Sequence, residues 1–246
     1  MIKLITLLTK LIIVALTALF FASCNNIIGH KSIEGSGNVT TEKRIVQGDF
    51  KSVEVSNAID VVIEQSDKTE IIVEADDNLQ KGITTKVENG KLIIACDYNS
   101  FTDVASKKVT VKMPIIEDLE TSSAASITSV GTLKGENIRL HSSSASNINA
   151  TVEADSINCD SSSGSSITIN GMTLQLKISA SSGSTIEAND LLANEINADA
   201  SSGGTIKVHP IVSLNAEASS GGAVNYNSVP KSIQKNTNSG GSINQQ

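Results

Sequence analysis

The sequence predicts an all-β fold, a β-solenoid (or β-helix) with coils of about 20 residues that follow a region rich in β-hairpins. Three observations predict it. Short strings rich in Ser and Gly return at a near-constant interval, apolar and polar residues alternate between them, and large aromatic side chains are almost absent. With four Phe, two Tyr and no Trp, the core must consist of Ile, Val, Leu and Ala in a geometry that small side chains can fill.

Seven Ser- and Gly-rich strings set the period of the repeat. A flexible linker has no reason to keep a branched residue at a fixed distance, whereas a solenoid must, because each coil stacks its side chains on those of the coil below. Glycine permits the positive φ of a tight corner, and Ser hydroxyls can bond the backbone there, so the strings are predicted to be corners. The first branched residues after the strings are Ile127, Ile148, Ile167, Ile186, Ile206, Val224 and Ile243, at intervals of 18 to 21 residues.

A second apolar series runs between these anchors, and an apolar or small residue stands two positions after each of its members. Alternation with period two is typical of a strand with one buried face, so each coil is expected to hold two short strands. The polar residues between the apolar ones are predicted to face outward, as a solvated surface with side-chain ladders or, alternatively, as a flat ligand-binding face. The series is Ile138, Ile157, Leu176, Ile196 and Leu214, and the outward amides include Asn149, Asn158, Asn197 and Asn215.

The chain before the repeats is also rich in strands. Residues 39–114 contain six short β-branched runs separated by turn signals, and Asn89-Gly90 is a strong hairpin signal. Pro114 marks the passage to the solenoid repeats of 115–246. No linker separates the two regions, so one continuous β domain is expected.

The first residues predict export. Residues 1–23 have the layout of a secretory signal peptide, with lysines before a short apolar run, and the run is too short for the roughly 20 residues of a membrane-spanning helix. A retained transmembrane anchor is the weaker alternative. "FASC" (21–24) resembles the lipobox of bacterial lipoproteins, which makes Cys24 the predicted site of lipidation; the alternative is an ordinary signal peptidase site beside an incidental cysteine. Residues 24–38 lack periodicity and are interpreted as a tether.

Charge and cysteine content narrow the partners. Loss of residues 1–23 removes two lysines and no acids, which leaves a net charge of about −9 and disfavours nucleic acid or an anionic membrane surface as a partner. Cys96 and Cys159 fall on the buried faces of predicted strands and are interpreted as small buried hydrophobes. An oxidising envelope would allow a disulfide between them, and the sequence leaves that open.

No catalytic or metal-binding constellation stands out. The three histidines, His30, His141 and His209, share no spacing, and the acidic pairs Asp76-Asp77 and Glu117-Asp118 are interpreted as solvated turns. We therefore expect no cofactor, no metal site and no enzymatic activity; a polysaccharide-cleaving β-helix enzyme is the least favoured alternative. Oxygen ligands near corners do not match the repeat of calcium-binding β-rolls. These ligands are Asp155, Asp160, Asp190 and Asp199.

The order of these features resembles a known family. "GSGNVTTEKRIVQGDFKSVEVSNAIDVVIEQSDKTEIIVEADDNL" (35–79), "VENGKLIIAC" (87–96), "VTVKMP" (109–114) and the repeated Ser-Gly corners are similar to the head GIN domain of auto-transporter adhesins. The resemblance implies a right-handed β-solenoid and a role, proposed for the family, in adhesion at the cell envelope. It implies no functional residues that can be carried over.

Together these features predict a non-enzymatic outer-membrane lipoprotein, held to the membrane by its N-terminal lipid. Its Ser/Asn/Thr-rich solenoid surface would bind a host or envelope protein or a glycan. The alternative is a structural or envelope-sensing lipoprotein that faces the periplasm, favoured by the absence of acidic residues directly after Cys24. Whether the chain forms a homo-oligomer stays open, because solenoid ends invite self-association.

Overall fold

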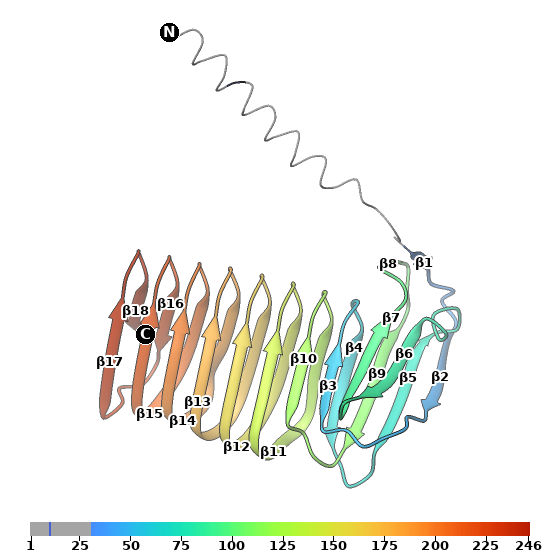
Figure 1. Ribbon diagram of the computed structural model, residues 1–246, viewed down its shortest axis with the longest axis horizontal. Helices are drawn as coiled ribbons and strands as arrows, with labels where there is room; N and C mark the ends of the chain where they lie inside the picture. Colours follow the sequence, from blue (N-terminus) through green and yellow to red (C-terminus); the bar gives the residue numbers. More distant parts are fainter. Residues whose placement is uncertain (1–9, 11–30) are drawn as a thin grey trace.

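The computed structural model describes residues 31–246 together with Lys10, and residues 31–246 form eighteen strands and no helix (Figure 1). None of the described residues belongs to a helix with the length and hydropathy of a membrane span. The strands are β1 (Ser32–Glu34), β2 (Val39–Arg44), β3 (Ser52–Val55), β4 (Asp60–Gln65), β5 (Glu70–Asp76), β6 (Ile83–Glu88), β7 (Lys91–Cys96), β8 (Ser100–Thr102), β9 (Lys107–Met113), β10 (Asp118–Thr121), β11 (Ser126–Ser142), β12 (Asn147–Ser161), β13 (Ser166–Ala180), β14 (Thr185–Ala200), β15 (Thr205–Ala218), β16 (Ala223–Tyr226), β17 (Ser232–Thr237) and β18 (Ser242–Gln245).

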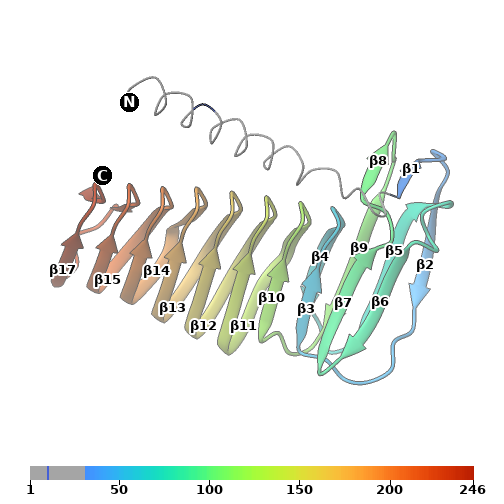
Figure 2. The ribbon, with the colours of Figure 1, turned by 45° about the horizontal axis from the view of Figure 1, so that its top comes forward.

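The predicted all-β solenoid is confirmed, with about seven turns of about 19 residues each. β11 to β15 stack in parallel, each running almost once around the rod (Figures 1 and 2). Each coil has two straight sides joined by a tight corner at one edge of the rod, the sharp edge, and by a wider bend at the other, the blunt edge. The blunt edge comprises residues 129–137, 151–156, 170–175, 189–195 and 209–213.

The two predicted apolar series are confirmed as columns of stacked side chains. Ile167 is in register with Ile148 and Ile186, and Leu176 is in register with Ile157 and Ile196. These side chains are at most 1% exposed. The structure differs from the expectation of two short strands per coil. Parallel hydrogen bonding continues around the blunt edge, so each coil from β11 to β15 forms one bent strand of 14 to 17 residues.

The Ser- and Gly-rich strings form the sharp edge. At each corner two consecutive residues have positive φ, as in Ser163 (54°) and Gly164 (70°), which is the geometry of a type I′ turn. The amide of Gly164 donates to the carbonyl of Ser182 in the next corner at 3.1 Å, and the same bond repeats along the edge. It also joins Ala58 to Ser123 at 2.9 Å, because residues 56–59 form an eighth corner that the sequence analysis missed.

The last residue of each of the seven Ser- and Gly-rich corners points into the rod and is small, whereas the eighth corner has Ile59 there. Ser165 is buried at this position, with its Oγ 2.7 Å from the carbonyl oxygens of Ser142 and Ser162. Two coils later Gly204 takes this place, where a Cβ would lie 2.2 Å from the carbonyl oxygen of Ala180. Gly222 and Gly241 in the following corners leave equally little room, with a Cβ at 2.2 and 2.1 Å from a carbonyl oxygen, so the backbone of these later corners requires glycine.

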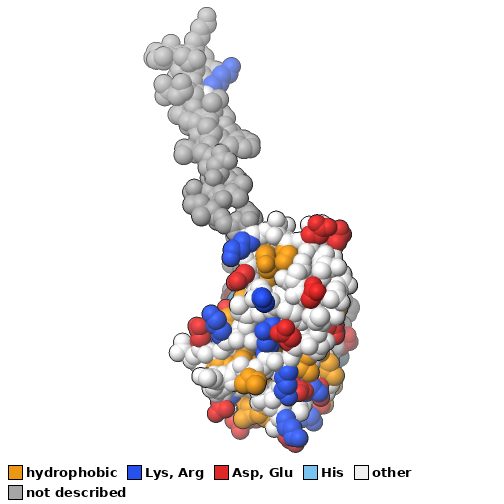
Figure 3. Space-filling view, turned by 90° about the vertical axis from the view of Figure 1, so that its right-hand side faces the viewer, with side chains coloured by type: hydrophobic (Ala, Val, Ile, Leu, Met, Phe, Trp, Pro, Cys, Tyr) orange, Lys and Arg blue, Asp and Glu red, His pale blue; other side chains and the backbone are white. Residues whose placement is uncertain are grey.

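Antiparallel strands cover the N-terminal end of the rod. β2 and β5 extend one side, and the hairpin of β6 and β7 extends the other, with Asn89 and Gly90 at the predicted turn. Figure 3 faces this end and shows basic and acidic side chains interspersed on it. β3 and β4 pair in parallel with β10 and β11, so stacking already begins before Pro114.

The C-terminal end is an open sheet edge with a charge in the core column. Lys235 of β17 is in register with buried Ala216, at a position that is apolar in the preceding coils. Its Nζ donates to Tyr226 Oη at 2.8 Å and lies 4.7 Å from the centre of that ring. A charge that points inward on an edge strand protects a sheet against edge-to-edge pairing, so the last coil has the chemistry of a cap.

Replacing this charge tests the cap. Lys235→Leu would leave an apolar end that includes Ile233, 40% exposed, beside free backbone edges. We expect the variant to associate at concentrations where the unmodified protein does not, as measured by light scattering after size exclusion. Lys231→Leu, an exposed lysine outside the core columns, is the matched control. Equal behaviour of the two variants would contradict the capping role.

Candidate functional site

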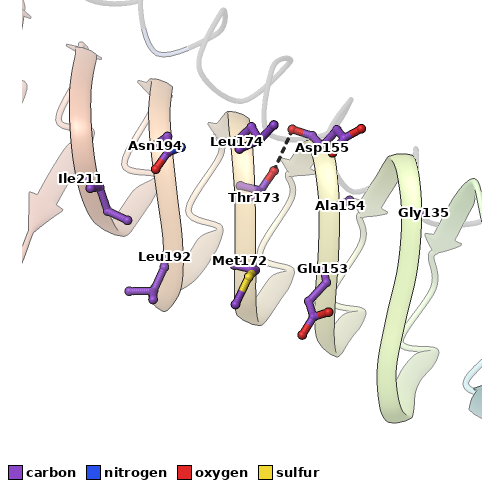
Figure 4. A pocket seen from close by; sticks show the side chains of 10 residues that line it. All are labelled: Gly135, Glu153, Ala154, Asp155, Met172, Thr173, Leu174, Leu192, Asn194 and Ile211. Carbon is purple, nitrogen blue, oxygen red and sulfur yellow. Dashed lines mark hydrogen bonds between the residues drawn. The ribbon is translucent and has the colours of Figure 1, made fainter.

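The most distinctive surface feature is a shallow groove of about 450 Å³ on the blunt edge (Figure 4). Four large apolar side chains form its floor: Met172 and Leu174 of β13, Leu192 of β14 and Ile211 of β15. They are 53%, 53%, 44% and 41% exposed, respectively. Figure 4 shows Met172 and Leu192 projecting from the bends of neighbouring coils. We refer to these four residues as the apolar groove.

The fold does not require apolar residues at the groove. Met172 and Leu192 belong to an outward column whose earlier members are Lys134 and Glu153. The same position of the coil therefore accepts a charged residue in two coils and an apolar one in the next two. Exposed apolar side chains that cluster without a structural need mark an interaction site, and Met adapts to partners of different shape.

The bend that carries the groove is held by a buried hydroxyl. Thr173 is 6% exposed, and its Oγ1 lies 3.2 Å from the carbonyl oxygen of Asp155 and 3.0 Å from that of Gln175. This side chain points inward between Met172 and Leu174, which consequently point out. The groove residues are thus placed by alternation about a fixed inward residue.

Carboxylates lie along the N-terminal side of the apolar groove. Glu153 and Asp155 line it there, and Glu136 lies close to Asp155. Asp190 and Glu195 belong to β14, the strand that carries Leu192. Among the described residues, the salt bridges include one of these five carboxylates, Glu153, whose Oε2 lies 2.9 Å from Lys134 Nζ.

The periodic pattern of the sequence does not single out the groove residues. All four lie off the two periodic apolar series, in stretches such as "GMTLQL" (171–176) where apolar residues appear at both alternating positions. Once the positions of the corners are known, this break in the alternation is the sequence signal that identifies the groove residues.

The outward amides expected on the straight sides form only a short ladder. Asn215 Nδ2 lies 3.4 Å from Asn197 Oδ1. One coil earlier in the same column Lys177 stands between Asn158 and Asn197 and interrupts the series. The face is polar and solvated along most of its length.

The interpretation of the acidic pairs as solvated turns is wrong for Asp76 and Asp118. Asp118 is 7% exposed and accepts two hydrogen bonds from Arg139, at 3.0 and 2.6 Å. Asp76 is fully buried, and its carboxylate accepts backbone N–H bonds from Gly37, Ala105 and Ser106 at 2.9 to 3.0 Å. Burial alone would raise the pKa of Asp76, but these donors outweigh it and hold the pKa below its ordinary value.

Asp76 and Asp77 together fasten the start of the domain. Asp77 accepts bonds from Ser36 Oγ at 2.6 Å and Asn38 Nδ2 at 2.9 Å. Residues 32–34 also pair with β8, so part of the segment interpreted as a tether is attached to the domain. Gly35 approaches so closely that a Cβ would lie 2.5 Å from Asp76 Oδ2.

The remaining predicted residues do not converge on one site. His141 lies on the outer face of β11 and His209 at the blunt edge, while His30 and the predicted lipidation site Cys24 lie outside the described residues. Asp160 and Asp199 share a column but are separated by Ser179, and Asp155 and Asp190 lie at the blunt edge. Within residues 31–246 no three His, Cys, Asp or Glu side chains are grouped so that they could hold a metal ion.

Both described cysteines are buried free thiols, in line with their interpretation as small hydrophobes. Cys159 is in register with Leu140 and Ile178 in an apolar column. Burial raises the pKa of both the Cys159 and Cys96 thiols, which keeps them protonated and unreactive.

Fold and surface define a class, an all-β solenoid that presents an exposed apolar groove. The family is defined by its sequence model: residues 49–230 match the model described as "Putative auto-transporter adhesin, head GIN domain", and the chain belongs to this family. No curated protein matches the sequence.

Solved structures share the fold. A "putative adhesin" from Bacteroides fragilis is 19% identical, with a TM-score of 0.80 over 87% of this chain and all of the other. A "putative lipid binding protein" from Parabacteroides distasonis is 24% identical, with a TM-score of 0.69 over 88% of this chain and all of the other. A "putative adhesin" from Parabacteroides merdae is 18% identical, with a TM-score of 0.68 over 87% of this chain and 99% of the other. At these identities the likeness concerns the fold alone.

Asp76 makes a pH-dependent contribution to stability that can be measured. Because the pKa of Asp76 is lowered on folding, its stabilisation is complete above the unfolded value of about 3.9 and is lost as the pH falls through the folded value. Asp76→Asn should therefore lower the free energy of unfolding at pH 7 by about 2 kcal/mol and weaken the loss of stability on acidification.

Chemical denaturation at pH 7 and at about pH 3 measures both effects. Asp67→Asn, at an exposed position, is the control and should leave both values unchanged. An Asp76→Asn protein as stable as the unmodified protein at pH 7 would show that the buried carboxylate does not hold the 35–37 loop.

Proposed function

We propose that this protein is a lipid-anchored, non-enzymatic module of the outer membrane that binds a protein or glycan partner through its solenoid surface. The observation that carries the proposal is the apolar groove, whose four side chains are 41% to 53% exposed. Two of them, Met172 and Leu192, stand in a column that earlier coils fill with Lys134 and Glu153. A rigid stack of coils displays such a groove without deformation, which lowers the entropic cost of binding.

Several observations support a role in adhesion or envelope interaction. The chain belongs to a family whose description names an adhesin. The lipobox-like "FASC" supports attachment to the membrane through Cys24. The scattered histidines and the inert buried cysteines favour a binding surface over an enzyme.

The groove can be tested with a charge-reversal pair. Every strand lies within residues 32–245, so the chain without its predicted signal peptide (24–246, with Cys24→Ser for solubility) keeps all of them. We expect this protein to bind at least one of the following: matrix proteins, host glycans or bacterial envelope fractions. Met172→Glu with Leu192→Glu should reduce that binding at least tenfold, because two charges would replace the apolar floor.

Ser166→Glu with Asn149→Glu places two charges at exposed positions of a straight side, in register with no carboxylate, and is the matched control. Thermal unfolding of both variants verifies that the fold is kept. If the Met172→Glu, Leu192→Glu variant still binds, the contact lies on another face of the rod. If the unmodified protein binds none of the preparations, the proposal is refuted.

Anchoring has its own test. In the full chain, Cys24→Ser should shift the protein from the membrane fraction to the soluble fraction, since one cysteine carries the lipid. Cys96→Ser, which changes a buried thiol, should leave it in the membrane fraction. Protease treatment of intact cells then separates surface display from the alternative of a periplasmic structural or sensing lipoprotein. A membrane-bound Cys24→Ser protein would contradict lipid anchoring.

A further inference from the structure

We infer that the apolar groove takes an extended polypeptide segment in which apolar side chains alternate with Lys or Arg. The inference rests on the proposed function and specifies the partner's chemistry. It combines two properties of the same surface, its apolar floor and its acidic rim.

The floor has the dimensions of a short stretch of extended chain. The apolar groove crosses β13, β14 and β15, and coils repeat at about 4.8 Å, so the floor is on the order of 10–15 Å long. An extended chain advances about 3.3 Å per residue, which allows roughly three or four residues along the floor. Met172 and Leu192 lie side by side in register, so that apolar side chains on one face of the segment would meet both.

The rim selects a cation. Asp155 lines the groove beside Leu174, and Asp190 precedes Leu192 by two residues. Neither carboxylate takes part in a salt bridge within the described part of the chain, and Lys134, which shares the outward column of Met172, is engaged by Glu153 at 2.9 Å. A partner with Lys or Arg beside its apolar residues would supply the missing positive charges, which speeds association and fixes orientation.

The same rim disfavours other occupants. A second copy of this chain, with a net charge of −7, would bring its own carboxylates against Asp155 and Asp190. A fatty acid or an anionic phospholipid would place its negative head group near the same side chains. Charge complementarity therefore favours a basic, apolar peptide over a second copy or a lipid.

The test uses three synthetic heptapeptides and the 24–246 protein with Cys24→Ser, with affinity measured by fluorescence anisotropy. A peptide that alternates Leu and Lys should bind at least ten times more tightly than one that alternates Leu and Glu or one that alternates Ser and Lys. Its affinity should fall as salt rises. Met172→Glu with Leu192→Glu should abolish the preference for Leu over Ser.

The acidic rim is tested by a matched pair of variants. Asp155→Asn with Asp190→Asn should weaken binding of the Leu/Lys peptide at least threefold and flatten its salt dependence. Asp199→Asn with Glu217→Gln removes two neighbouring acids from a straight side of the rod and should change neither. An equal loss in both pairs would mean attraction by net charge alone, and the inference would fall.

Other occupants give different results. Binding to phosphatidylethanolamine/phosphatidylglycerol vesicles that needs Met172 and Leu192 would overturn the inference in favour of a lipid. A concentration-dependent dimer that the Met172→Glu, Leu192→Glu variant loses would overturn it in favour of a second copy. If envelope or host preparations bind through the groove while the three peptides bind alike, the proposed function stands and this inference fails.

Discussion

The hydrogen bond between successive sharp corners is the constraint on which the rest of the structure depends. The amide of Gly183 donates to the carbonyl of Ser202 at 3.1 Å, and equivalent bonds fix each corner against the next. With the corners in register, every residue lies beside its equivalent in the neighbouring coils, and the core becomes a set of columns. This arrangement lets Ile, Val, Leu and Ala fill the interior, because stacked branched side chains need no large rings to exclude water. It also explains the plain composition of the seven Ser- and Gly-rich corners, where two positive φ values and a small inward residue are met by Ser, Ala and Gly.

The sequence predicts the columns well because a column is a periodic property of the chain itself. Ile186 and Ile206, 20 residues apart, are in register as their spacing implies. The features that escaped prediction depend on contacts distant in sequence or on exceptions to the period. The corner at Asn57 and Ala58 has the right backbone but no Ser-Gly string. The carboxylate of buried Asp76 is satisfied by N–H donors of Gly37 and Ser106, about 30 to 40 residues away. The sequence next to Asp76 contains no signal for these contacts.

Separate demands on the inside and the outside of a coil allow the outer surface to vary without cost to the fold. At the blunt edge, buried Thr173 holds the bend, while the residues on either side of it face solvent. The outward column can therefore change from Glu153 to Met172 between adjacent coils, with the register intact. For the same reason the apolar groove could not be inferred from periodicity: its residues resemble core residues in type and differ only in the side of the strand on which they lie.

The two ends of the rod place the apolar groove relative to the predicted anchor. At the N-terminal end, the loop bound by Asp76 and β1 docked on β8 fix the chain to the domain from Ser32 onward. Cys24 precedes Ser32 by eight residues, which span at most about 28 Å when fully extended. A lipid on Cys24 would thus hold the N-terminal end near the membrane.

The strands of the apolar groove, β13 to β15, lie toward the other end of the stack, beyond the coils of β10, β11 and β12 (Figure 1). A rigid stack between anchor and groove would keep the two apart, whereas a flexible linker of equal length would let the groove fold back onto the bilayer. With a lipid on Cys24, the middle coils would act as a spacer, and the in-register bonds at the corners would make that spacer stiff.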